Sequence, residues 1–92
     1  MAGNRILVSP DELEKVAKQF KAASDQNQQA STKLSQTVSA MNSQWDGMTS
    51  ERFFHDFEQS KKQMKQYTQL LEQVSTELKQ IAQRFRQADN AR

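Results

Sequence analysis

The sequence predicts an all-α fold: an antiparallel helix-turn-helix hairpin that dimerises into a four-helix bundle. Two long stretches carry apolar residues at helical spacing, and Gly47 separates them near the midpoint of the 92 residues. We expect a first helix over about residues 10–45, a turn over about 46–49, a second helix over about 50–88 and a short tail at 89–92. The whole chain should therefore form a single helical-hairpin domain.

The segment Ser9-Pro10-Asp11-Glu12 has the pattern of a helix start. Serine at the cap and glutamate three residues later form a capping box. Proline suits the first helical position, because its missing N–H would have no partner there. The first helix should therefore begin near Pro10.

Within each helix the apolar and small residues fall into two columns at heptad spacing. In the first helix the columns contain Leu13, Phe20, Leu34 and Met41, and then Val16, Ala23, Ala30 and Thr37. In the second they contain Phe57, Met64, Leu71, Leu78 and Phe85, and then Phe53, Ser60, Tyr67, Val74, Ile81 and Ala88. Folding the helices back at Gly47 brings Asn27 opposite Tyr67, with small residues facing large ones.

One hairpin cannot cover this apolar stripe, and each large side chain left in water forgoes about 1.5–3 kcal/mol of burial. Two hairpins packed face to face would cover it, so a homodimer is the simplest closed solution, and a paired hairpin of different sequence is the alternative. The residues expected in the core of the hairpin and its dimer are Leu13, Val16, Phe20, Leu34, Val38, Met41, Phe53, Phe54, Phe57, Met64, Tyr67, Leu70, Leu71, Val74, Leu78 and Ile81.

The turn motif Trp45-Asp46-Gly47 lies between the two helices. Gly47 suits a position just past a helix end, where the backbone becomes left-handed, and Thr49 or Ser50 can cap the following helix. Trp45 has two interpretations: it covers the end of the hydrophobic core, or it belongs to a recognition motif.

The residues offer no basis for catalysis or for cofactor binding. The chain has no cysteine, its only histidine is His55, and its two glycines form no phosphate-binding loop. No serine has a histidine or lysine base at a meaningful spacing. We therefore expect a non-enzymatic protein without cofactor or metal.

The net charge of +2 is spread thinly along the chain. The densest basic cluster, Lys61, Lys62 and Lys65, is predicted to be a solvated helix face, and no nucleic acid is expected as a partner. The apolar run Ile6-Leu7-Val8 is too short for a cleavable secretory signal, and no stretch is long enough for stable insertion in a membrane. The residues alone therefore predict a cytoplasmic protein.

Two capped helices around a central Trp45-Asp46-Gly47, without cysteine or cleavable signal, resemble the WXG-motif family of early secreted antigenic target-like proteins. These are small substrates of the type VII (ESX) secretion system of Gram-positive bacteria and actinobacteria. The resemblance implies a virulence-associated protein that is cytoplasmic before export and secreted as a folded dimer. It also implies a role either as a secreted factor or as an export partner of other substrates.

The family carries an export signal, Tyr-x-x-x-Asp/Glu, near the end of the second helix, and the resemblance places it beside the Trp-x-Gly turn of the dimer partner. The nearest match here is Phe85-Arg86-Gln87-Ala88-Asp89, which lacks the phenolic hydroxyl. Phe85 and Asp89 are therefore the export-signal candidates, although Phe85 also fits as the last core residue of its column. The resemblance implies an FtsK/SpoIIIE-like membrane ATPase as the partner that reads the signal.

Two other classes of function also fit the sequence. A cytoplasmic coiled-coil adaptor or structural protein would have the same composition and periodicity. A membrane-active factor would use the apolar helix faces, but the glutamine-rich and nearly neutral polar faces argue against it.

Overall fold

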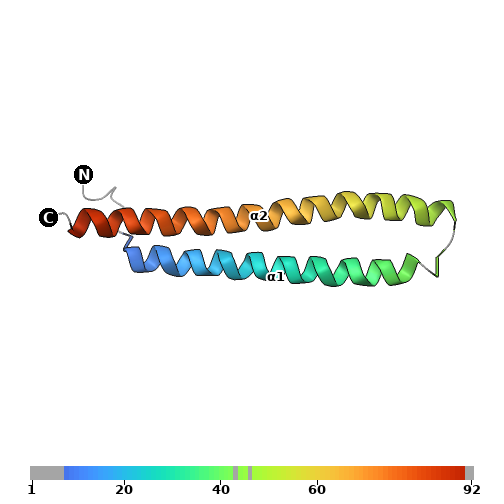
Figure 1. Ribbon diagram of the computed structural model, residues 1–92, viewed down its shortest axis with the longest axis horizontal. Helices are drawn as coiled ribbons and strands as arrows, with labels where there is room; N and C mark the ends of the chain where they lie inside the picture. The colour runs from blue at the N-terminus through green and yellow to red at the C-terminus, as the bar shows by residue number, and fades with distance from the viewer. Residues whose placement is uncertain (1–7, 43, 46, 91–92) are drawn as a thin grey trace.

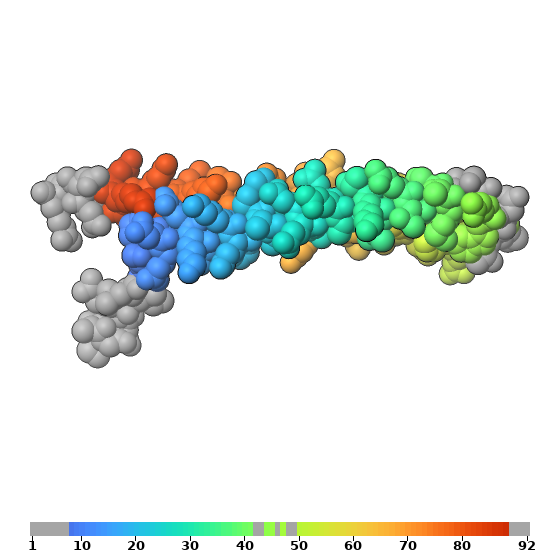
Figure 2. Space-filling model, turned by 90° about the horizontal axis from the view of Figure 1, so that it is seen from below, coloured from blue at the N-terminus to red at the C-terminus, as the bar shows by residue number. Residues whose placement is uncertain are grey.

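The computed structural model describes residues 8–42, 44–45 and 47–90, which form two long antiparallel helices (Figure 1). Helix α1 spans Pro10–Asn42 and helix α2 spans Met48–Asn90. They lie side by side in a rod that measures 68 × 23 × 16 Å. Figure 2 shows the rod from the side of α1, which lies in front of α2 along the length of the rod. The predicted all-α hairpin of two antiparallel helices is confirmed.

The first helix begins at the predicted cap. The backbone N–H of Glu12 donates to Ser9 Oγ at 3.1 Å, and the N–H of Leu13 donates to the Ser9 carbonyl at 3.1 Å. Asp11 and Glu12 in the first turn also place negative charge at the positive end of the helix dipole. The capping interpretation of this segment is therefore confirmed.

The turn is longer than the sequence suggested. Helix α1 ends at Asn42 rather than near residue 45, and the N–H of Gln44 donates to the Met41 carbonyl at 2.9 Å. Helix α2 begins at Met48 and extends to Asn90, two residues beyond the expected end at both termini. Asp46 of the turn motif lies outside the described residues.

Gly47 has a φ of 117° and directly precedes the first residue of α2. It therefore adopts a positive φ at the start of the second helix, whereas the sequence placed this conformation at the end of the first. Its carbonyl accepts hydrogen bonds from the Glu51 N–H at 3.2 Å and from Ser50 Oγ at 2.6 Å. The buried Ser50 hydroxyl thus acts as a donor to Gly47, although it was expected to act as a cap.

The two helices meet along a seam of small and polar residues. The buried seam residues are Ala17, Ser24 and Val38 of α1 and Leu71, Ser75 and Ala82 of α2. Small side chains allow the two backbones to approach closely enough for side chains of one helix to bond carbonyls of the other.

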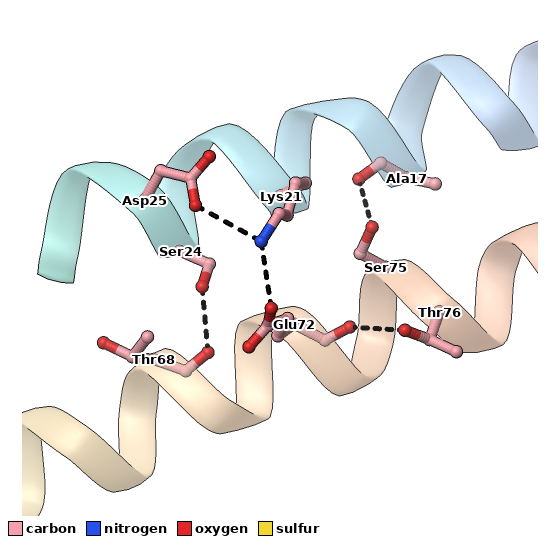
Figure 3. A network of polar contacts seen from close by, with 8 residues as sticks. All are labelled: Ala17, Lys21, Ser24, Asp25, Thr68, Glu72, Ser75 and Thr76. Carbon is pink, nitrogen blue, oxygen red and sulfur yellow. Dashed lines mark hydrogen bonds and ion pairs between the residues drawn. The ribbon is translucent and has the colours of Figure 1, made fainter.

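Three seam side chains make such bonds across the hairpin. Ser24 Oγ donates to the Thr68 carbonyl at 3.1 Å, and Ser75 Oγ donates to the Ala17 carbonyl at 2.7 Å (Figure 3). Asn27 Nδ2 donates to the Met64 carbonyl at 3.1 Å and to Thr68 Oγ1 at 2.8 Å. Asn27 was expected opposite Tyr67, so the observed register agrees with the predicted one to within a turn.

The seam is rotated by one residue relative to the predicted columns. Positions 17, 24 and 38 take the place expected for 16, 23 and 37, and positions 68, 75 and 82 take the place expected for 67, 74 and 81. As a result, large apolar side chains lie beside the seam and are 37–54% exposed in this chain. We call these residues the outer apolar face: Val16, Leu34, Met41, Phe53, Tyr67, Leu70 and Phe85.

Neither described helix contains an apolar stretch of the length that a membrane crossing requires.

Candidate functional site

Trp45 belongs to a cluster of four aromatic rings at the turn end of the hairpin. Its ring centroid lies 5.3 Å from that of Phe53 and 5.9 Å from that of Phe54. Phe53 also packs on Phe54 at 5.4 Å and stacks on Phe57 at 6.3 Å. These separations are those of favourable aromatic pairs, each worth about 0.5–1.5 kcal/mol beyond the area that it buries.

The cluster serves the fold and also reaches the surface. Trp45, Phe54 and Phe57 are half-buried, whereas Phe53 is 37% exposed and belongs to the outer apolar face. Trp45 therefore covers the end of the hairpin while part of its ring stays accessible. The two interpretations of this tryptophan are compatible with each other.

The export-signal candidates, Phe85 and Asp89, lie at the other end of the rod, close to the end of α2. Phe85 is 43% exposed and belongs to the outer apolar face. Asp89 is in the last turn of α2, and its side chain lies outside the described part of the chain. A single hairpin therefore does not bring Phe85 and Trp45 together, because the rod that separates them is 68 Å long.

Arg86, inside the candidate export signal, ties the end of α2 to the start of α1. Its Nη2 lies 2.7 Å from Asp11 Oδ1 and 3.2 Å from Glu14 Oε1, and its Nη1 bonds the other oxygen of Glu14. This hydrogen bond from Arg86, helped by the charge of Arg86, lowers the pKa of Glu14 against the opposing effect of desolvation. It also raises the pKa of Arg86. Sequence reasoning missed this clamp, since finding it requires the register of the two helices.

A second ion-pair group lies near the middle of the hairpin. Lys21 Nζ lies 2.9 Å from Glu72 Oε1 on the other helix and 3.3 Å from Asp25 Oδ1 one turn further along α1 (Figure 3). The hydrogen bond to Glu72, and then that to Asp25, raises the pKa of Lys21. Because Lys21 and Glu14 are one heptad apart, both ion-pair groups lie on the same edge of the hairpin. Single exposed pairs contribute little to stability, whereas a bidentate arginine–carboxylate pair such as Arg86–Glu14 contributes more.

The predicted core residues divide into three groups by exposure in the hairpin. Val38 and Leu71 are buried. The half-buried residues are Leu13, Phe20, Phe54, Phe57, Met64, Val74, Leu78 and Ile81. The exposed residues are Val16, Leu34, Met41, Phe53, Tyr67 and Leu70. His55 is exposed, and within the described ranges no three His, Cys, Asp or Glu side chains gather as a metal site.

The sequence matches a protein family and several relatives. The sequence pattern of WXG100, "Proteins of 100 residues with WXG", matches residues 5–90. Protein YukE of Bacillus subtilis is 34% identical over 89 residues, which cover 97% of this chain and 91% of YukE. The type VII secretion system extracellular protein A of Staphylococcus aureus is 26% identical over 84 residues, covering 91% and 87% of the two chains.

Solved structures agree with the hairpin. The crystal structure of the secreted protein EsxB from Bacillus anthracis superposes with a TM-score of 0.83 at 40% identity and covers 92% of this chain and 97% of EsxB. The EsxA structure from Geobacillus thermodenitrificans also gives a TM-score of 0.83, covering 95% of both chains. Its 24% identity supports the shared fold alone.

Proposed function

This chain belongs to the WXG100 family and is a secreted, non-enzymatic substrate of type VII secretion, and from this premise we propose that it is exported as a folded dimer. In the dimer two hairpins pack through their outer apolar faces to form a four-helix bundle. The observation that carries this proposal is the outer apolar face itself, seven large apolar side chains that the hairpin leaves 37–54% exposed.

The energetics favour pairing over a lone hairpin. The apolar residues buried by the hairpin are few, and a chain of 92 residues is marginally stable without additional burial. Covering the outer apolar face gains up to about 1.5–3 kcal/mol for each large side chain. In a dimer with two-fold symmetry, the outer apolar face of one hairpin packs against the same face of the other, so a homodimer needs no second gene product. A related hairpin of different sequence would also fit this face.

An antiparallel pairing of the two rods gives the two ends of the hairpin a joint role. In each hairpin Trp45 and Phe85 lie at opposite ends, because Trp45 precedes the start of α2 at Met48 and Phe85 is close to its end at Asn90. In the antiparallel dimer the turn of one hairpin therefore lies beside the Phe85 end of its partner. We propose that Trp45 and Gly47 of one hairpin and Phe85 and Asp89 of the other form the surface read by the FtsK/SpoIIIE-like ATPase of the secretion system.

The pairing is tested by placing a charge on the outer apolar face. Leu70 is 53% exposed in the hairpin, so Leu70→Asp leaves the seam intact while it places an unpaired charge in the dimer interface. We expect light scattering at micromolar concentration to give twice the 10.6 kDa chain mass for the parent protein and a lower mass for Leu70→Asp. The neighbouring exposed Gln69, changed to Asp, is the matched control and should remain dimeric. A fully helical parent protein with the mass of one chain would refute the proposal.

A further inference from the structure

We propose that a polar groove between α1 and α2 binds an acidic peptide segment of a partner protein, one that also carries an apolar anchor residue. The groove has a volume of about 630 Å³ and is lined by both helices. We define the polar groove by six of its lining residues: Ser31, Thr32 and Ser35 of α1 and Lys61, Lys62 and Lys65 of α2. Its volume lies within the range of ligand sites in proteins.

The polar groove and the outer apolar face share no residue. Along α2, Lys61 and Lys65 of the groove fall on the same edge as Glu72, which pairs with Lys21, whereas Tyr67 and Leu70 fall on the opposite side of the seam. Covering the outer apolar face in a dimer therefore leaves the groove accessible. The inference goes beyond the proposed export and holds whether or not the hairpin pairs.

The α2 wall of the groove carries three lysines and two glutamates, Glu58 and Glu72, so it has an excess of one positive charge. Lys61 Nζ lies 3.4 Å from Glu58 Oε1, whereas for Lys62 and Lys65 the described part of the chain provides no ion-pair partner. By contrast, the cations Lys21 and Arg86 are each paired with carboxylates of the other helix. The charge at Lys62 and Lys65 is complementary to carboxylates of a ligand.

The α1 wall supplies a hydroxyl group that still needs a partner. Ser31 Oγ is buried and has no hydrogen-bond partner among the described residues. Buried polar atoms are almost always hydrogen-bonded, and the seam hydroxyls of Ser24 and Ser75 follow that rule. Ser31 lines the groove, so a rotation of its buried hydroxyl toward the groove would let an oxygen of a bound peptide accept its hydrogen bond.

An apolar hollow adjoins the groove on its turn side, and this favours a peptide over a simple anion. The hollow, of about 170 Å³, shares Ser35, Glu58 and Lys61 with the groove, and its apolar part consists of Val38, Phe54 and Phe57. We call these three side chains the socket. An apolar cavity of about 150 Å³ accepts a benzene ring, so the socket suits one apolar side chain.

The spacing between socket and lysines defines the expected ligand. Residues 54–57 and 62–65 are eight positions apart on α2, which corresponds to about 12 Å along the helix. About four residues of extended peptide cover this distance. The ligand should therefore carry an apolar residue and, three to four positions away along its chain, acidic residues.

The test uses a synthetic peptide that matches this description, acetyl-GLSGEEG-amide, at a fixed ionic strength of about 0.15 M. Titration into the ¹⁵N-labelled full chain should give saturable amide shifts around Ser31, Lys62, Lys65 and Val38, with a Kd below about 1 mM. A peptide with both glutamates changed to glutamine, and one with leucine changed to glycine, should each bind at least tenfold more weakly. Inorganic phosphate should not compete at the same ionic strength.

Protein variants distinguish binding in the polar groove from general electrostatic attraction to the chain. Lys62→Glu with Lys65→Glu should weaken binding at least tenfold, and Ser39→Trp, at the exposed rim of the socket, should weaken only the leucine-containing peptide. The matched control is Lys15→Glu with Lys18→Glu, an exposed pair with the same spacing on α1, which should change the Kd less than twofold. Circular dichroism should show unchanged helicity for each variant.

Several results would overturn the inference. These are an absence of saturation, equal weakening by the control pair, shifts that map to the outer apolar face, and binding of phosphate as tight as that of the peptide. The last result would identify a simple anion site instead of a peptide site.

Discussion

Gly47 illustrates how a single residue shapes the hairpin. Its φ of 117° is a conformation that L-residues with a side chain rarely adopt, and it occurs directly before α2. The space where a Cβ would lie is open, with no heavy atom within 4 Å. The need for glycine therefore comes from the backbone conformation and not from crowding.

We expect Gly47→Ala to destabilise the protein by about 1–3 kcal/mol, because alanine must hold a sparsely populated backbone conformation. Thermal unfolding should show a midpoint lower by roughly 4 °C or more. Chemical synthesis allows a sharp control: D-alanine at this position favours positive φ and should keep the parent stability. Equal losses for L- and D-alanine would mean that flexibility, and not the sign of φ, matters here.

Arg86 is the second residue whose role depends on its exact partners. The clamp to Glu14 lowers the pKa of Glu14 in the folded state, so between the lowered value and the ordinary value of about 4.3 the unfolded state binds more protons. The stabilisation from this pair is fully present above the ordinary value. It is lost as the pH falls through the lowered folded pKa.

The pH dependence can be tested with Arg86→Gln. We expect this variant to have a lower urea midpoint than the parent protein at pH 7, and the difference should shrink as the pH falls below about 4.3. Arg84→Gln is the matched control, because Arg84 is exposed and has no ion pair within the described residues. A difference that stays constant from pH 7 to pH 3 would contradict the role assigned to Glu14.

At the scale of the helices, sequence reasoning predicted the hairpin, its start at Pro10 and an approximate register, since capping and periodicity are local signals. The columns that it predicted to face each other lie one residue away from the observed seam. A search for periodicity counts only apolar side chains, so it assigns Ser24 and Ser75 to the solvent-exposed surface. Both are buried in the seam because their hydroxyl groups donate hydrogen bonds to carbonyls of the opposite helix. The Arg86 clamp escaped prediction for the same reason, because the two helices must first be placed together.

Two serines on α2 test whether the seam is displaced by one residue from the predicted columns. Ser75 is 2% exposed and bonded across the seam, whereas Ser60 is exposed in the column predicted to be apolar. Ser75→Leu should destabilise by about 1–3 kcal/mol through overpacking, although leucine fits the heptad pattern. Ser60→Leu should change stability by no more than about 0.5 kcal/mol. If urea unfolding gave the opposite order, the seam would follow the sequence columns after all.

On the scale of the whole molecule, the rod presents two different sides and two different ends. The outer apolar face lies on one side of the seam, the ion pairs and the polar groove lie on the other, and the two candidate recognition elements lie at opposite ends. The seam uses small residues, so the large apolar residues remain available to a partner hairpin. In the proposed dimer, antiparallel pairing would join the two ends into one recognition surface.

Export measurements can separate recognition from folding. Asp89 lies in the last turn of α2, so its replacement is expected to change stability little, and urea unfolding of Asp89→Ala checks this. A loss of secretion in Asp89→Ala, measured as supernatant against cell pellet in a host with a working type VII system, would therefore report recognition. Phe85→Tyr, which restores the hydroxyl of the family signal, should leave export unchanged or improve it.

Trp45→Ala requires a stability measurement beside the secretion assay, because the ring contacts both Phe53 and Phe54. Removing a packed aromatic side chain costs up to about 3–5 kcal/mol when it is fully buried, and less at the half-buried Trp45. We expect this variant to remain helical and dimeric but to stay in the cell, because the proposed export signal joins the turn of one hairpin to the Phe85 end of its partner. Trp45→Phe, which keeps an aromatic ring at the corner, controls for packing and should unfold close to the parent temperature. Normal secretion of a stable dimer that lacks both the Trp45 ring and the Asp89 carboxylate would refute the joint signal and leave the aromatic corner with a structural role alone.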